Sequence, residues 1–142
     1  MKLGLRTGFA IVLLMLSAMC GSAVGDDKYI LWDYNAQMTN QVGFFEPNPG
    51  YVYMVVDIEL ENHGYSEFDV NPFYFEAVVN KVQYECTTTT FDESINTLPT
   101  VTLQDGGVVS GQLVYQVLEG SKEYSIEYTG YTWIGYNFMR KS

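Results

Sequence analysis

The sequence has too few cysteines for a fold held together by disulfides. Of its 142 residues only Cys20 and Cys86 are cysteine. Cys20 lies in an N-terminal segment that we expect to be removed, and one remaining thiol cannot form an internal disulfide. The stability must therefore come from a hydrophobic core. We expect Cys86 to be a small buried side chain, with an exposed thiol for intermolecular pairing as the alternative.

Basic residues are also scarce. Seven Lys and Arg stand against seventeen Asp and Glu, for a formal net charge of −10. Without residues 1–25, five basic and seventeen acidic residues remain, which makes the charge −12. Such a surface repels phosphate backbones and anionic lipid headgroups. We therefore expect no nucleic-acid partner.

Residues that support catalysis are nearly absent. His63 is the only histidine, and it lies in the turn sequence Asn62-His63-Gly64. The sequence has no G-x-S-x-G elbow for a serine nucleophile, and no basic residue lies next to Cys86 in the sequence to activate its thiol. We predict that the protein is not an enzyme and holds no cofactor, and we expect His63 to be an exposed turn residue. A hydrolase with an unrecognised site is the least favoured alternative.

One acidic series invites a metal-binding interpretation. Asp57, Glu59 and Glu61 alternate along a single predicted strand, and calcium prefers oxygen ligands. Residues two apart on a strand do not converge on one ion, however, and no D-x-D-x-D-G loop is present. We predict a solvated face and no metal site. Binding of calcium or a small ligand near the 91–99 loop stays open as an alternative.

Long hydrophobic runs are missing except near the N-terminus. Lys2 and Arg6 precede an uncharged apolar run over residues 8–19, and small residues follow up to Gly25. This pattern predicts a secretory signal peptide over residues 1–25, cut after Gly25 or, as the next choice, after Ala23. An uncleaved membrane anchor is the rival interpretation, although the strongly apolar part is shorter than a span requires.

Cys20 adds a third interpretation of the N-terminus. The sequence Ser17-Ala18-Met19-Cys20 loosely resembles a lipoprotein cleavage box, with the large Met19 as a departure from it. Cys20 is thus a candidate lipidation site that would tether the domain to a membrane surface. Otherwise we expect no membrane span in the mature form, and a secreted or cell-surface location.

The remaining residues, 26–142, are predicted to form one β-rich domain. Apolar side chains alternate with polar ones most clearly over residues 51–62, between the turn cluster at 46–50 and Asn62-His63-Gly64. The core-facing set of this strand is Val52, Met54, Val56, Ile58 and Leu60. The water-facing set is Tyr51, Tyr53, Val55, Asp57, Glu59 and Glu61.

A second clear strand covers residues 109–117. Gly111 lies on its apolar face, which predicts a bulge or close packing by a neighbouring aromatic. Asn80-Lys81 predicts a two-residue hairpin turn, and residues 91–99 predict a longer loop. The other predicted strands cover residues 28–36, 41–45, 73–79, 82–88, 124–128 and 131–138. About seven or eight short strands indicate an antiparallel β-sandwich.

Three segments resemble a family of exported bacterial and archaeal immunoglobulin-like domains of unknown function, often found on lipoproteins. They are the strand over residues 51–62 with His63-Gly64, the sequence NPFYF over residues 71–75, and LQDGGVVSGQLVY over residues 103–115. A mycobacterial immunoprotective extracellular antigen has a similar domain. The resemblance covers residues 29–128 and implies an immunoglobulin-like sandwich outside the cytoplasm. It implies no catalytic residues.

The C-terminal segment is unusually aromatic. Its rings are Tyr124, Tyr128, Tyr131, Trp133, Tyr136 and Phe138. We expect most of them to complete the core by cross-strand pairing. Tyr131, Trp133 and Tyr136 are in addition a candidate interaction patch. The predicted function is therefore a non-catalytic exported domain that binds an envelope or extracellular protein or serves as an envelope scaffold.

Overall fold

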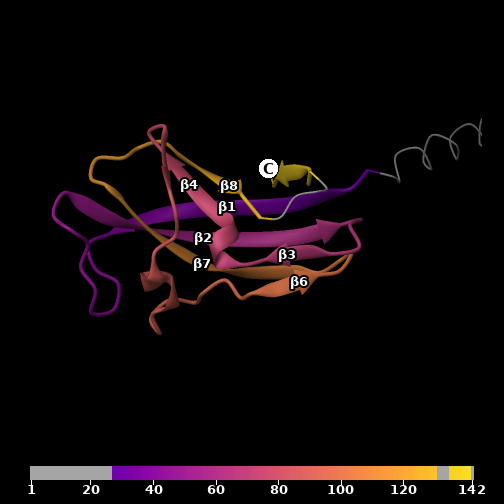
Figure 1. The fold of residues 1–142 in the computed structure, drawn as a ribbon, viewed down its shortest axis with the longest axis horizontal. Helices are drawn as coiled ribbons and strands as arrows, with labels where there is room; N and C mark the ends of the chain where they lie inside the picture. The colour runs from indigo at the N-terminus through magenta and orange to yellow at the C-terminus, as the bar shows by residue number, and fades with distance from the viewer. Residues whose placement is uncertain (1–26, 131–134, 142) are drawn as a thin grey trace, which may run out of the picture.

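A four-stranded sheet is built around one long central strand, β2 (Tyr51–His63). β1 (Tyr29–Thr39) pairs antiparallel with one edge of β2, and β7 (Val108–Leu118) pairs antiparallel with the other edge. β9 (Phe138–Arg140) adds to β1, which makes the strand order β7-β2-β1-β9 (Figure 1).

The computed structural model describes residues 27–130 and 135–141. The predicted signal peptide, Cys20, Tyr131 and Trp133 lie outside these residues, so the expectations for them stay predictions. The two helical segments in the described part are short 3-10 turns, η1 (Pro72–Tyr74) and η2 (Thr88–Phe91). No helix in this part has the length and apolar character that a membrane crossing requires.

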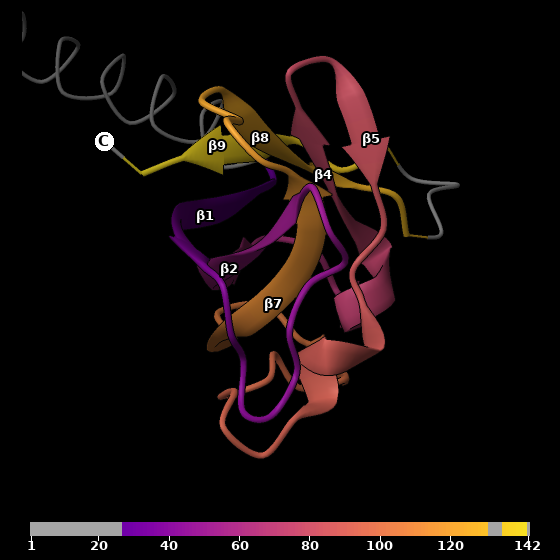
Figure 2. The same ribbon diagram turned by 90° about the vertical axis from the view of Figure 1, so that its left-hand side faces the viewer.

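Two smaller sheets face the same core. In one, β4 (Phe75–Val79) lies between β5 (Val82–Tyr84) and β8 (Tyr124–Tyr128), as Figure 2 shows. In the other, β3 (Phe68–Val70) pairs with β6 (Val101–Leu103). Every pairing within these two sheets is antiparallel.

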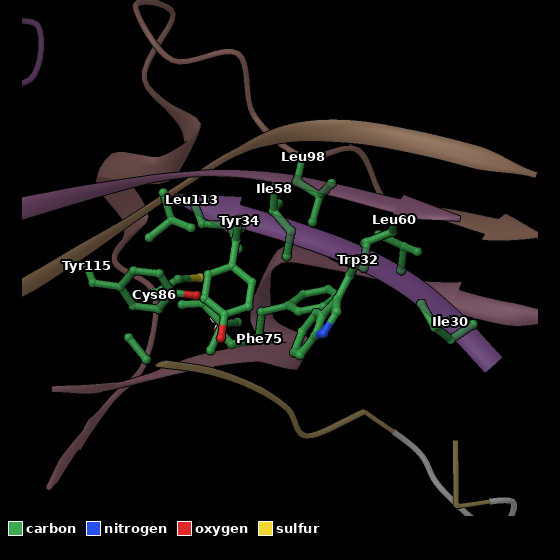
Figure 3. Close-up of a cluster of buried hydrophobic side chains, with 14 of the residues drawn as sticks. Ile30, Trp32, Tyr34, Ile58, Leu60, Phe75, Cys86, Leu98, Leu113 and Tyr115 are labelled. Atoms are coloured by element: carbon green, nitrogen blue, oxygen red, sulfur yellow. Dashed lines mark hydrogen bonds between the residues drawn. The ribbon is translucent and has the colours of Figure 1, made fainter. Parts of the chain in front are cut away.

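The main core takes side chains from all three sheets and from the loop before β6. Figure 3 shows its middle, where Trp32 and Tyr34 of β1 face Phe75 of β4. Residues without any solvent exposure are Ile30, Met54, Val56, Leu60, Phe68, Phe75, Ala77, Leu98, Leu113, Tyr115 and Val117. The predicted all-β fold is confirmed.

β2 confirms the predicted core face and corrects part of the predicted outer face. Met54, Val56, Ile58 and Leu60 are buried, and Val52 is partly buried and packs against the core. Tyr53, however, was expected to face water and is only 5% exposed. It forms a second cluster with Val42 and Val114, because loops fold back over this end of the sheet. Period-two alternation cannot predict such a cover.

A buried asparagine fixes the far end of β2. The Asn62 side chain donates to the carbonyl oxygens of Tyr65 and Leu103, each at 2.9 Å, and accepts from the Tyr65 amide at 3.1 Å. Both the nitrogen and the oxygen of this side chain therefore have hydrogen-bond partners. A polar side chain with no solvent exposure needs such partners, because it cannot bond to water. Asn62 thereby ties β2 to the loop that precedes β3 and to the last residue of β6.

The hairpin turn at Asn80-Lys81 is confirmed. Both residues have positive φ, 49° and 69°, which is the geometry of a type I′ turn between β4 and β5. The longer loop predicted over residues 91–99 is also confirmed, since the segment between η2 and β6 contains no strand.

Three details of the predicted sandwich are wrong. Residues 41–45 form a tight turn with one isolated bridge rather than a strand. The described residues hold nine strands, four of them only three residues long, rather than seven or eight. The pairing is not antiparallel throughout, since β9 runs parallel to β1. The predicted strand over 131–138 is described only from residue 135, and β9 begins at its last residue.

Gly111 allows a backbone segment to approach β7. A Cβ atom at this position would lie 2.6 Å from the amide nitrogen of Leu98. The close neighbour is therefore the backbone of Leu98, whereas the sequence predicted an aromatic ring or a bulge. The amide of Leu98 donates to the Gln112 carbonyl at 3.0 Å, so the approach is part of the hydrogen bonding.

We predict that Gly111→Ala destabilises the domain by about 2 kcal/mol, because the added methyl must push backbone rather than a flexible side chain. Urea unfolding followed by fluorescence measures the change. Ser110→Ala, at the exposed neighbouring position, is the control and should stay within about 0.5 kcal/mol of the parent. Equal stability of the Gly111→Ala variant and the parent would contradict the close approach.

Candidate functional site

Tyr136, a member of the predicted aromatic patch, packs against the core. Its ring meets those of Tyr65 and Phe68 edge to face, with centroids 4.8 and 4.9 Å apart. Its hydroxyl donates to the Glu67 carbonyl at 3.3 Å. This half-buried ring therefore extends the core, and its role in a patch with Tyr131 and Trp133 stays a prediction.

A hollow of about 440 Å³ opens beside this ring, between β8 and the C-terminal segment. Trp32, Tyr128, Tyr136 and Phe138 supply its aromatic walls. Burial raises the pKa of both tyrosine hydroxyls, and Tyr128 donates to the Asp69 carbonyl at 2.7 Å. These hydroxyls stay protonated at neutral pH and serve the packing of the domain.

Cys86 is buried, as expected, with 7% of its surface exposed. Figure 3 shows it beside Tyr115, whose hydroxyl donates to the Phe75 carbonyl at 2.6 Å. Burial raises the pKa of the Cys86 thiol to about 11, against a smaller opposing effect of a hydrogen bond with Thr90. A neutral, buried thiol is a poor nucleophile.

His63 lies at the end of β2 rather than free in a turn. Its ring stacks on that of Tyr29 with centroids 4.6 Å apart, and its Nε2 atom is 3.4 Å from Oε1 of Glu61. Side-chain exposure is 35%. These contacts are with a tyrosine ring and a carboxylate, so the histidine has the surroundings of a structural residue at a sheet edge.

Two members of the predicted carboxylate ladder, Asp57 and Glu59, line a polar hollow of about 330 Å³ on the outer face of the four-stranded sheet, whereas Glu61 lies beside His63. Asp33 of β1 lies directly opposite Glu59 of β2, and Arg140 approaches Asp33 at 3.7 Å. Asp57 accepts a hydrogen bond of 2.9 Å from the Gln112 side chain. Within residues 27–130 and 135–141, no three His, Cys, Asp or Glu side chains are grouped closely enough to hold a metal ion.

Sequence reasoning missed a group of exposed rings, which we call the phenylalanine end: Phe44, Phe45, Phe73 and Phe91. Phe44 is 99% exposed, and the other three are between 52% and 53% exposed. The rings of Phe73 and Phe91 are 5.5 Å apart. Gly43, which precedes Phe44, lies against the carboxylate of Asp92, which follows Phe91. Phe73 of η1 and Phe91 of η2 therefore form one pair of exposed rings, and the turn that carries Phe44 and Phe45 meets the residue that follows this pair.

The turn that carries Phe44 is tightly closed. Val42 and Phe45 exchange backbone hydrogen bonds of 2.8 and 3.0 Å, so Gly43 and Phe44 form the tip. Gly43 has a φ of +57°, which favours glycine at this position. The adjacent apolar pair Phe44-Phe45, set between a glycine and a turn cluster, was the only sequence signal for this site.

Comparison with known proteins agrees with the predicted resemblance. A family profile described as "Domain of unknown function (DUF4352)" matches residues 22–138. No curated protein matches the sequence.

Two solved structures are similar. One is a candidate lipoprotein, ycdA, from Bacillus subtilis, with a TM-score of 0.58 and 19% identity over 70% of this chain. The match covers 30% of that protein, so the chain spans about a third of its length, and the likeness shows the fold alone. The other is the secreted protein MPT63 from Mycobacterium tuberculosis, with a TM-score of 0.44 and 9% identity over 78% of this chain and 81% of that one.

The surroundings of Cys86 give a testable result. With a pKa of about 11, on the order of one thiol in a thousand is ionised at pH 8. We expect iodoacetamide to leave the Cys86 peptide unlabelled in the folded protein and to label it fully in guanidinium chloride, as measured by mass spectrometry. Rapid labelling of the folded protein would show that the thiol is accessible.

Proposed function

The chain belongs to the DUF4352 family of domains of unknown function, and on that premise we propose that it is an exported, non-catalytic domain that binds a partner protein. In this proposal the two-layered β fold is an immunoglobulin-like sandwich, which presents loops from a rigid scaffold. The partner is an envelope or extracellular protein.

Export is supported by two independent features. Residues 1–25 have the charged start, apolar middle and small-residue end of a secretory signal. The matched structures carry descriptions of a candidate lipoprotein and a secreted protein. These features support the proposed secreted or cell-surface location, with a lipid tether if Cys20 is acylated.

The phenylalanine end is the observation that carries the binding role. Folding gains most when large apolar rings leave water, yet four rings on adjoining segments keep half or more of their surface exposed. Grouped exposed apolar surface of this kind marks interaction sites on soluble proteins. Aromatic side chains are also enriched at protein interfaces.

A non-catalytic role agrees with where the shifted pKa values lie. Cys86, Tyr115 and Tyr128 all have raised pKa values, and burial is the main cause for each. The two tyrosine hydroxyls donate to backbone carbonyls, which commits them to the fold. Perturbed groups with structural partners are weaker candidates for chemistry than groups that meet in a cleft.

We predict that replacing Phe44 and Phe91 by serine lowers the yield of a cross-linked partner by about tenfold, since aromatic anchors dominate interface energies. The full-length chain is cross-linked with formaldehyde in cells of its source organism and analysed by mass. Val108→Ser is the matched control, because Val108 is 56% exposed and lies at the opposite end of β7 from the loops that carry the rings. Equal losses in both variants would contradict a role for the phenylalanine end.

A second candidate, binding of calcium or another small ligand, is favoured by the polar hollow lined by Asp33, Asp57 and Glu59. A ligand that binds only the native state must raise its stability. Because no three acidic, histidine or cysteine side chains of the described residues are grouped closely enough to hold a metal ion, we expect the melting temperature to stay constant up to millimolar calcium. A concentration-dependent rise, lost in Glu59→Gln, would instead favour the second candidate.

A further inference from the structure

We propose that Phe44 is an anchor that inserts into an apolar pocket on the partner protein, and that this pocket is rimmed by lysine or arginine. The inference rests on the proposed function and names the chemistry of the surface that the phenylalanine end contacts. Three observations support it: the exposure of the Phe44 ring, the rigidity of the Val42–Phe45 turn, and the negative charge near that turn.

Phe44 gives the fold almost nothing in its present position. With 99% of its surface in water, its ring makes no packing contribution to either core cluster. A phenyl ring is among the largest apolar groups that a binding event can bury. A pocket that encloses this ring would therefore gain apolar contact without disturbing the domain.

The turn holds the ring in a defined place before any partner arrives. Val42 is 4% exposed and packs with Tyr53 and Val114, which anchors the base of the turn on the sheet. The Gln41 side chain donates to the Gly43 carbonyl at 2.9 Å, and the Tyr53 hydroxyl donates to the Glu46 carbonyl at 3.2 Å. Binding through a pre-organised loop loses less conformational entropy than binding through a loose one.

The other rings of the phenylalanine end extend the contact around this anchor. Phe45 follows Phe44 at the turn and is half exposed, and Phe91, which pairs with Phe73, directly precedes the Asp92 that lies against Gly43. A central buried ring surrounded by further apolar contacts that exclude water is the usual arrangement of an interface hot spot.

Negative charge surrounds the rings and selects the partner. Glu46 and Glu93 are exposed near Phe45 and Phe91 in the sequence, and Asp92 lies against the turn itself. Hydrogen bonds from the Ser94 side chain and backbone lower the pKa of Asp92, so its carboxylate is charged at neutral pH. No lysine or arginine occurs in residues 40–48 or 88–96.

Charge complementarity therefore favours a basic rim around the receiving pocket. An anionic membrane surface would repel the same carboxylates. A second copy of the chain would bring together two molecules that each carry a formal charge of −10. A partner protein with an apolar pocket would bury the Phe44 ring, and a cationic rim around that pocket would pair with the carboxylates beside it.

Photo-cross-linking from position 44 tests the inference. The full-length chain carries p-benzoylphenylalanine in place of Phe44, or in place of Val108 as the control, in cells of the source organism. We expect one protein adduct from position 44 and none of the same mass from position 108. Mapping of the attachment site should return a peptide with apolar residues flanked by lysine or arginine. Adducts of position 44 with lipid, with a second copy of the chain, or with an acidic peptide would overturn the inference.

Charge variants test the rim separately. Glu46→Gln combined with Glu93→Gln should lower the position-44 adduct by about fivefold, since opposite charges at an interface rim speed association. Asp27→Asn combined with Glu67→Gln removes the same charge from exposed positions away from the phenylalanine end and should leave the yield within about twofold of the parent. Equal effects of the two pairs would overturn the proposed cationic rim.

The result also separates this inference from the proposed function. A protein adduct from another surface position, with none from position 44, overturns the anchor and leaves the binding role intact. If the benzoylphenylalanine yields no protein adduct from position 44, from position 108 or from Tyr136 in the predicted patch, the proposed function fails as well.

Discussion

Pairing of β2 along both of its edges is the constraint on which the rest of the structure depends. All eleven residues of β1 pair with one edge, and β7 pairs with the other over the same number of residues. Once these registers are set, the alternation of side chains along β2 decides which face meets the two smaller sheets. Gly111 and Leu98 can approach each other only because β7 has this register, and Asn62 can reach the loops only because β2 ends where it does.

Much of this architecture could be predicted from local patterns, where a local cause decides the outcome. Strict alternation over residues 51–62 is sufficient to predict β2. Asn80 predicts the hairpin turn between β4 and β5 because asparagine adopts positive φ readily, and Lys81 takes the same conformation in the second turn position. The segment 41–45 was predicted to be a strand from its apolar residues. Gly43, with a φ of +57°, instead reverses the chain there, and Val42 and Phe45 close a tight turn. Burial of Tyr53 depends on a distant loop that covers it, and no pattern within β2 encodes that cover.

The candidate site was harder to predict than the fold because burial and exposure of an aromatic ring leave the same sequence signature. Phe75 has no solvent exposure and Phe73 is 53% exposed, although the two are separated by a single residue. The aromatic C-terminal segment drew attention by its composition, yet Tyr136 belongs to the packing around Phe68. Which rings reach the surface is therefore a property of the assembled domain and not of any one segment.

The parallel pairing of β9 with β1 bears on how the domain is assembled in time. Ile30 pairs with Phe138, and the amide of Ile30 donates to the Asn137 carbonyl at 2.7 Å, so the contact joins segments from opposite ends of the described chain. Loop closure between such distant segments is entropically costly, and folds rich in these contacts reach the native state slowly. Until β9 arrives, the free edge of β1 remains able to pair with another chain. The last three-residue strand thus covers the β1 edge at Ile30, Leu31 and Trp32, and this part of the edge is paired only after the C-terminal segment has reached it.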